Sequence, residues 1–164
     1  MFKLLFVLLV ICMIIIVLSY THTASSHKQG VAAPNYVALA RQDASAAGIS
    51  PDLFERQIKQ ESNFNPKALS AAGAQGIAQF MPTTAQGLGI DPWNAIQALQ
   101  GAARLMASYF KQYHADYAMA LAAYNYGPGN VTATIQRCHA QWRACLPAET
   151  QHYIAIITNQ SPSD

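Results

Sequence analysis

Glu61 is the residue whose chemistry most needs an explanation, because it lies where a helix should be apolar. It belongs to the stretch FERQIKQESNF, which Ser50 and Pro51 precede as a typical helix start. At about 100° per residue, Ile58 lies about 40° from Phe54 around the helix, and Glu61 lies about 20° from Phe54 on the other side. Glu61 is therefore predicted to lie on the core-facing stripe, in the last turn of the helix.

The predicted position of Glu61 favours a carboxylic acid that stays protonated near neutral pH. Burial disfavours the charged form, and so does the negative end of the helix dipole, so both raise the pKa of the carboxyl group. Such an acid can protonate the leaving oxygen as a glycosidic bond breaks. A salt-bridged or snorkelling glutamate at a helix end is the alternative interpretation.

A second carboxylate, which most glycosidases use as nucleophile or base, is not evident. Asp52 and Asp116 lie at predicted helix starts, and Asp91 lies in a turn. Glu55 points away from Glu61 on the same helix. The sequence thus favours a mechanism in which the substrate assists, or one in which polar groups hold a water molecule.

Short helices joined by tight turns must position these groups. The first predicted elements are a helix over about 35–47, the Glu61 helix, and a glycine-rich turn at 71–76 that leads into a short helix interrupted by Pro82. A long amphipathic helix follows, capped by Asn94 and with Ile96 on its apolar stripe. The last three helices are one capped by Asp116, one that begins at the Gly-Pro-Gly of 127–129, and one that begins at Pro147. No run alternates apolar and polar residues as a half-buried strand would. The predicted fold is mainly α, a compact helical domain of a size that suits a chain of 164 residues.

The N-terminal region predicts export. Residues 4–18 form an unbroken apolar run behind Lys3, intermediate in length between a signal-peptide core and the ~20 residues that span a bilayer. Residues 1–20 are interpreted as a signal peptide or an uncleaved membrane anchor, and 21–34 as a linker to the folded domain at 35–164. The anchor is favoured, because cleavage after Ala24 would place His22 where a small residue is preferred.

The charge balance argues against a nucleic-acid partner. All eight carboxylates follow residue 34, as do all of the ten lysine and arginine residues except Lys3 and Lys28. The folded part is therefore formally neutral and shows no basic stripe of the kind that nucleic-acid binders carry.

Cys138 and Cys145 are close in sequence, and in an exported chain such cysteines often form a disulfide. Two free thiols are the plain alternative. A metal site that adds His139 and His152 to the two cysteines matches no established zinc spacing. No metal or cofactor is therefore expected.

Four ordered segments resemble a known family. ESNFNPKALSAAGAQGIAQFMPTTA, DPWNAIQALQGAARLMASYF, AMALAAYNYGPGNV and PAETQHYIAII look like the catalytic domain of soluble lytic transglycosylases. The similarity spans roughly residues 38–158. It implies a lysozyme-like helical fold, with goose-type lysozymes as relatives.

The resemblance implies cleavage of the β-1,4 bond between N-acetylmuramic acid and N-acetylglucosamine in peptidoglycan. Glu61 would protonate the glycosidic oxygen while the substrate's N-acetyl oxygen stabilises the anomeric centre. Glu61 would then deprotonate the muramic C6 hydroxyl, which closes a 1,6-anhydro ring. Ser62 resembles the serine that hydrogen-bonds this acid.

The resemblance also implies substrate-binding residues around Glu61. Gln79 would hydrogen-bond a sugar or its acetamide, with Phe80 packed below. Tyr124 and Asn125 match the Ala-Tyr-Asn of the family, whose side chains face the cleft. Tyr153 resembles the tyrosine whose hydroxyl reaches toward the acid, with core burial as the alternative.

Two other functions stay open at this stage, a hydrolytic lysozyme on the same scaffold and an accessory glycan-binding part of an envelope machine. The expected partners are peptidoglycan strands, the inner membrane through residues 2–20 if they are not cleaved, and a secretion, conjugation or phage machine that opens the wall locally. The expected location is the periplasm.

Overall fold

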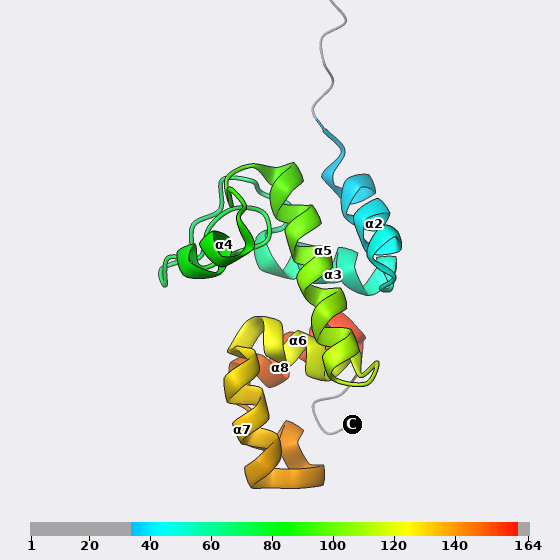
Figure 1. Ribbon diagram of the computed structural model, residues 1–164, viewed down its shortest axis with the longest axis vertical. Coiled ribbons are helices and arrows are strands. Elements are labelled where there is room, and N and C mark those ends of the chain that lie inside the picture. Colours follow the sequence, from blue (N-terminus) through cyan, green and yellow to red (C-terminus); the bar gives the residue numbers. More distant parts are fainter. Residues whose placement is uncertain (1–33, 161–164) are drawn as a thin grey trace, which may run out of the picture. The chain divides into compact units, whose positions relative to one another are not determined.

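The computed structural model describes residues 34–160, and the statements below concern that part of the chain. Its helices are α2 (Tyr36–Ala47), α3 (Pro51–Ser62), α4 (Pro82–Leu88), α5 (Ala95–Gln112), α6 (Tyr117–Tyr126), α7 (Pro128–Cys138), the 3₁₀ helix η1 (His139–Cys145) and α8 (Ala148–Thr158), as Figure 1 shows. The described residues contain two isolated β-bridges and no strand, so the mainly α prediction is confirmed. The predicted export segment at 1–20 and nearly all of the linker lie outside the described residues.

Side-chain caps begin three of the main helices as the sequence predicted. The side-chain oxygens of Ser50, Asn94 and Asp116 accept hydrogen bonds from the backbone N–H of the third residue of α3, α5 and α6, at 3.3, 3.2 and 2.9 Å. These bonds satisfy N–H groups that have no partner within the helix, which fixes where each helix starts.

The long helix α5 lies between α2 on one side and α6 on the other (Figure 1). Helix α3 packs against α2 and α8, and α6 also contacts α7 and α8. The buried positions of α5 and α6 are rich in alanine, which lets helices approach closely. No helix among residues 34–160 has both the length and the hydropathy needed to cross a bilayer.

Two details of the helix prediction are wrong. Pro82 begins α4 at its first position instead of interrupting a helix. A proline is well suited to that position, because the N–H it lacks would have no partner within the helix anyway. Ile96, placed on the apolar stripe of α5, is 48% exposed, while the neighbouring Ala95 and Ala98 face the core.

Cys138 and Cys145 form the predicted disulfide, which closes η1 against the end of α7. In the chain-entropy picture a loop of this size contributes about 2–3 kcal/mol. Replacing both cysteines with alanine should therefore lower the free energy of unfolding by about this amount while activity stays unchanged, since neither cysteine contacts Glu61. Denaturant unfolding measures the first effect. Non-reducing peptide mapping that finds two free thiols in exported protein would contradict the bridge.

Candidate active site

Glu61 lies in the last turn of α3, as its helical position predicted. The residue keeps part of its surface exposed, but its carboxyl group is densely surrounded by protein. Burial raises the pKa of the Glu61 carboxyl from 4.5 to about 7, and a hydrogen bond from Tyr153 opposes that rise. The group therefore exchanges its proton near neutral pH, as a catalytic acid must.

Two tyrosines from other helices lie near the Glu61 carboxyl, and one of them donates a hydrogen bond to it. The Tyr153 hydroxyl, on α8, donates a hydrogen bond of 2.5 Å to Glu61 Oε1. Tyr124, on α6, lies close enough to Glu61 for the carboxylate charge to affect it. Burial and this charge raise the pKa of the Tyr124 and Tyr153 hydroxyls well above 10. Both tyrosines therefore stay neutral, and Tyr153 acts on the acid as a hydrogen-bond donor.

Two side chains form hydrogen bonds to a loop at residues 68–80 and hold it beside the site. The Ser62 hydroxyl donates to the carbonyl oxygen of Ile77 at 2.7 Å, and the Tyr124 hydroxyl donates to that of Ala78 at 2.8 Å. The expected hydrogen bond from Ser62 to Glu61 is thus wrong, because the single hydroxyl hydrogen of Ser62 goes to the loop. Ser62 holds the loop in place beside the acid.

Gln79 and Phe80 both lie in the 68–80 loop, where Gln79 is half-buried and Phe80 is buried. The Gln79 amide NH₂ donates to the carbonyls of Gly76 at 2.8 Å and Ala68 at 3.3 Å, and its oxygen has no partner among the described residues. Phe80 is 2% exposed and packs on the Tyr124 ring at 5.9 Å between centroids. Direct contact of Phe80 with a sugar is therefore contradicted, since its ring is buried in the core.

Asn125 lies near the C-terminus of α6, and its side chain is exposed. Its oxygen accepts a hydrogen bond of 2.8 Å from the hydroxyl of Thr150, a buried residue of α8. This bond orients the amide so that its NH₂ group has no protein partner among the described residues. Two hydrogen-bond donors are thereby available to a ligand.

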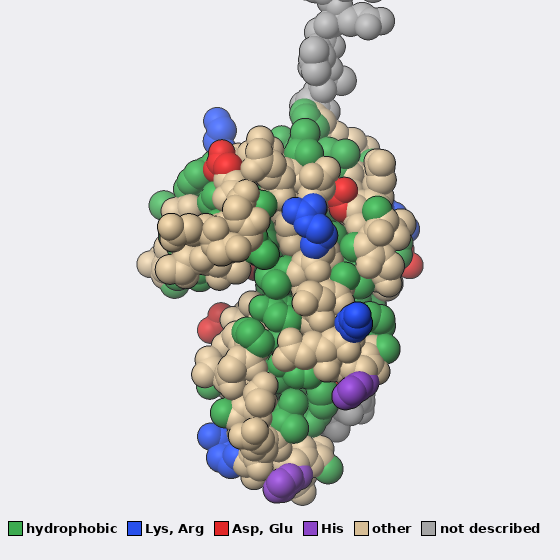
Figure 2. All heavy atoms as spheres, viewed as in Figure 1, with side chains coloured by type: hydrophobic (Ala, Val, Ile, Leu, Met, Phe, Trp, Pro, Cys, Tyr) green, Lys and Arg blue, Asp and Glu red, His purple; other side chains and the backbone are tan. Residues whose placement is uncertain are grey.

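The surface is hollowed on one side of the molecule. Figure 2 shows an indentation on the left, between the part that carries α4 and the part that carries α6 and α7. The C-terminal ends of α3 and α6, which bear Glu61 and Asn125, both point to this side in Figure 1. An indentation that is open to solvent is accessible to an extended polymer.

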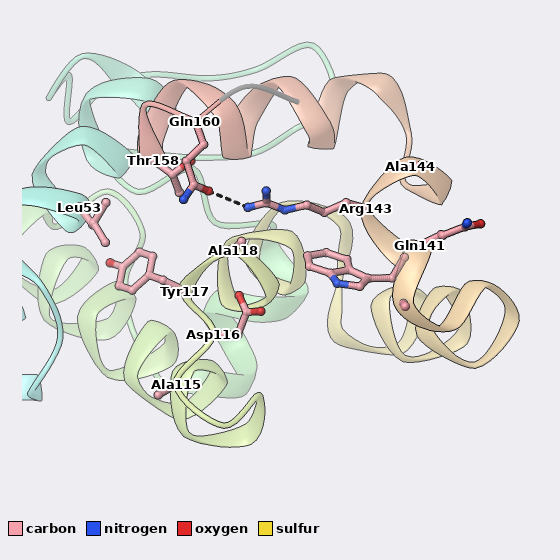
Figure 3. Close-up of a pocket in the computed structure, with 12 residues that line it drawn as sticks. Leu53, Ala115, Asp116, Tyr117, Ala118, Gln141, Arg143, Ala144, Thr158 and Gln160 are labelled. Atoms are coloured by element: carbon pink, nitrogen blue, oxygen red, sulfur yellow. Dashed lines mark hydrogen bonds between the residues drawn. The ribbon is translucent and has the colours of Figure 1, made fainter. Parts of the chain in front are cut away.

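A different cavity, of about 780 Å³, lies near the start of α6 and η1 and is drawn in Figure 3. Its lining includes Leu53, Asp116, Trp142 and Arg143, and Arg143 donates to the Gln160 side chain at 2.9 Å. Because Leu53 and Glu61 lie eight positions apart on α3, their Cα atoms are about 12 Å apart along the helix axis. None of the predicted site residues lines this cavity.

Sequence reasoning missed two polar residues behind the site, Thr150 and Gln57. Gln57 is fully buried on α3, four residues before Glu61. That spacing places both on one helix face and was a usable signal. Thr150 had no such signal, because its partner Asn125 lies 25 positions away.

Comparison with known proteins places these residues in a described family. The profile of the transglycosylase SLT domain matches residues 38–143. Membrane-bound lytic murein transglycosylase D of Escherichia coli K12 is 31% identical over an alignment of 107 positions, which covers 57% of this chain and 24% of that protein. Peptidoglycan transglycosylase gp16 of Escherichia phage T7 is 33% identical over an alignment of 105 positions, which covers 59% of this chain and 8% of that protein. The chain thus spans a quarter or less of these relatives' length.

Two solved structures share the fold. The lytic transglycosylase Slt of Pseudomonas aeruginosa has a TM-score of 0.63 at 24% identity, covering 73% of this chain and 22% of its own. The 70 kDa soluble lytic transglycosylase of Escherichia coli has a TM-score of 0.64 at 21% identity, covering 78% and 25%. At this identity the likeness concerns the fold alone, and it confirms the predicted lysozyme-like helical class.

Proposed function

The chain belongs to the transglycosylase SLT domain family, and on that premise we propose that it is a lytic transglycosylase that cleaves the glycan strands of peptidoglycan. The observation that carries the proposal is the buried Glu61 carboxyl, with a pKa of about 7 and a hydrogen bond from Tyr153. Relatives named as murein and peptidoglycan transglycosylases support the same substrate.

In the proposed reaction Glu61 acts first as acid and then as base. It gives its proton to the glycosidic oxygen between N-acetylmuramic acid and N-acetylglucosamine, and the C1–O4 bond breaks. The substrate's acetamide oxygen stabilises the anomeric carbon. The Glu61 carboxylate then takes the proton of the muramic C6 hydroxyl, and the new C1–O6 bond closes a 1,6-anhydro ring.

The surroundings of Glu61 support a mechanism without a second protein carboxylate. Burial and the Tyr153 hydrogen bond are the causes that act on the Glu61 pKa, and no other carboxylate of residues 34–160 is among them. Asp52 and Glu55 form ion pairs with Arg41 on another part of the surface. The substrate's own groups therefore supply the steps that a second carboxylate performs in most glycosidases.

Substrate binding is assigned to the polar groups with free capacity beside Glu61. The Asn125 NH₂ group would donate to a sugar hydroxyl or acetamide, and the Gln79 oxygen would accept from one. Tyr124 and Tyr153 would bound the site beside the reacting bond, while Ser62 would hold the 68–80 loop. Each role follows from the hydrogen bonds that these side chains leave unused or use toward the loop.

The products distinguish a transglycosylase from a lysozyme. We expect the purified full chain, kept in detergent because of its apolar N-terminal run, to release 1,6-anhydromuropeptides from peptidoglycan without added metal or nucleotide. When the geometry is right, the muramic C6 hydroxyl attacks as if it were present at a concentration of ~10⁵ M or more, which favours it over an external water molecule. Mass spectrometry should find products one water lighter than those of a hydrolase, and chitin oligomers should be poor substrates.

The control for this assay is the same preparation carrying Glu61→Gln. Muropeptides with reducing ends only would support the lysozyme alternative instead. Binding to glycan without any cleavage would support an accessory role in an envelope machine.

We also propose that residues 1–20 export or anchor the protein, that 21–34 link them to a catalytic domain at 35–164, and that the domain works in the periplasm. A relative named as membrane-bound and another from a phage support a role at the cell wall. Local wall opening for a secretion, conjugation or phage machine suits such a domain. Fractionation of cells followed by N-terminal sequencing would test both the location and the cleavage.

A further inference from the structure

Gln57 is a buried polar residue that the fold itself does not explain. It lies on α3 with no exposed surface, and neither its amide nitrogen nor its amide oxygen forms a regular hydrogen bond within the described residues. A buried amide without partners lowers stability, and an apolar side chain of the same shape would not carry this cost. Its presence therefore calls for a function.

The neighbours of Gln57 indicate what that function is. Gln57 lies one helical turn before Glu61, so both side chains leave α3 on the same face. The Tyr153 hydroxyl of α8 donates to Glu61 Oε1. The Gln57 side chain also acts on this hydroxyl and lowers the pKa of the phenol, as a hydrogen-bond donor does. Neither polar atom of the Gln57 amide has another hydrogen-bond partner within the described residues, so the amide is free to act on the Tyr153 hydroxyl.

We propose that Gln57 is a positioning residue that holds the Tyr153 hydroxyl against Glu61 and thereby sets the proton affinity of that carboxyl. The catalytic consequence rests on the proposed role of Glu61 as acid and base. An N–H directed at the Tyr153 oxygen polarises its O–H bond, which strengthens the hydrogen bond to Glu61. The carboxylate form of Glu61, needed for the second step, is stabilised as a result.

Other groups near Glu61 do not take over this role. Within residues 34–160, Tyr153 from α8 and Tyr124 from α6 are the titratable side chains found to interact with Glu61, and Tyr109 from α5 acts in turn on Tyr124. The Tyr124 hydroxyl donates to the Ala78 carbonyl and not to Glu61. Tyr153 is therefore the donor through which Gln57 reaches the acid.

The test is Gln57→Met, which keeps the length of the side chain and removes both polar atoms. Three results are expected. The Tm stays equal or rises, since a buried amide that forms no regular hydrogen bond is removed. The Glu61 titration midpoint, followed by carboxyl ¹³C NMR on the protein without substrate, rises by about 0.5 unit or more. The kcat falls about tenfold while KM changes less than about twofold, and the alkaline limb of the pH profile moves to higher pH.

The matched control is Gln60→Met, the same change at an exposed position of α3 next to Glu61, which should alter none of these quantities. A lower Tm with an unchanged Glu61 midpoint would overturn the proposal and make Gln57 a packing residue. An unchanged midpoint and an unchanged Tm would overturn it as well. If the wild-type protein has no lytic activity, the proposed function fails, but the NMR titration still decides the role of Gln57.

Discussion

Replacement of Glu61 with glutamine is expected to lower lytic activity at least ~100-fold, the usual scale of general acid catalysis. Glutamine keeps the size of the side chain and can still accept the Tyr153 hydrogen bond, but it has no acidic proton to give to the glycosidic oxygen. Muropeptide release from purified peptidoglycan measures the effect. Retention of most of the activity would remove Glu61 from the mechanism.

The same substitution has a pH-dependent effect on stability that an inert residue would not show. The folded-state pKa of Glu61 is raised from 4.5 to about 7, so the folded protein binds this proton more tightly than the unfolded chain does. The cost of the buried charge is therefore absent below about pH 4.5, grows as the pH rises through this window, and is complete above about pH 7. Glu61→Gln should stabilise the fold by roughly 1–3 kcal/mol at pH 8 and by little at pH 4.

Glu55→Gln is the matched control for both readouts. Glu55 lies on the same helix, but it forms an exposed ion pair with Arg41 and lies outside the site. Surface pairs contribute about 1 kcal/mol or less, so stability should change little and activity should not change. A similar loss of activity in both variants would show a general effect of altering α3.

Gly76→Ala is expected to be the most destabilising single substitution in the 68–80 loop. A Cβ at this position would lie 1.8 Å from the carbonyl oxygen of Pro92, and the backbone of Gly76 has a φ of +73°. Because the colliding atom belongs to the backbone, no side-chain rotation relieves the contact. A loss of roughly 3–5 kcal/mol is expected, or about 10–20 °C in Tm.

Gly73→Ala separates the steric part of this effect from the conformational part. Gly73 shares the loop and has a φ of +90°, but a Cβ there would meet nothing within 4 Å. The free energy of unfolding of Gly73→Ala should therefore fall by only about 1–2 kcal/mol. Calorimetry on both variants makes the comparison, and equal losses would contradict the close approach of Gly76 to Pro92. Activity should fall further in Gly76→Ala, because displacement of the loop breaks its bonds to Ser62 and Tyr124.

Local rules predicted most of the helices and the position of Glu61 on α3. Asn94 and Asp116 cap the helices that their short polar side chains predicted, because a cap depends on atoms only three residues apart. Glu61 lies on the inner face because helical periodicity determines which side of α3 each residue occupies. Family motifs, together with this periodicity, were enough to predict the helical class and the acid.

The family resemblance suggested that the Tyr153 hydroxyl reaches toward Glu61, but only the tertiary structure decided between this contact and burial of Tyr153 in the core, and only it showed which residues support the site. Tyr153 lies 92 positions from Glu61, and the Thr150–Asn125 bond joins two different helices. Ser62 donates its hydrogen bond to Ile77 in the loop and not to the acid, because the fold brings the Ile77 carbonyl to it. Phe80 lies in the core, because the fold brings the Tyr124 ring against it. Sequence spacing determines the face of one helix, but the partner of a side chain depends on how distant helices pack, and that packing minimises the free energy of the whole domain.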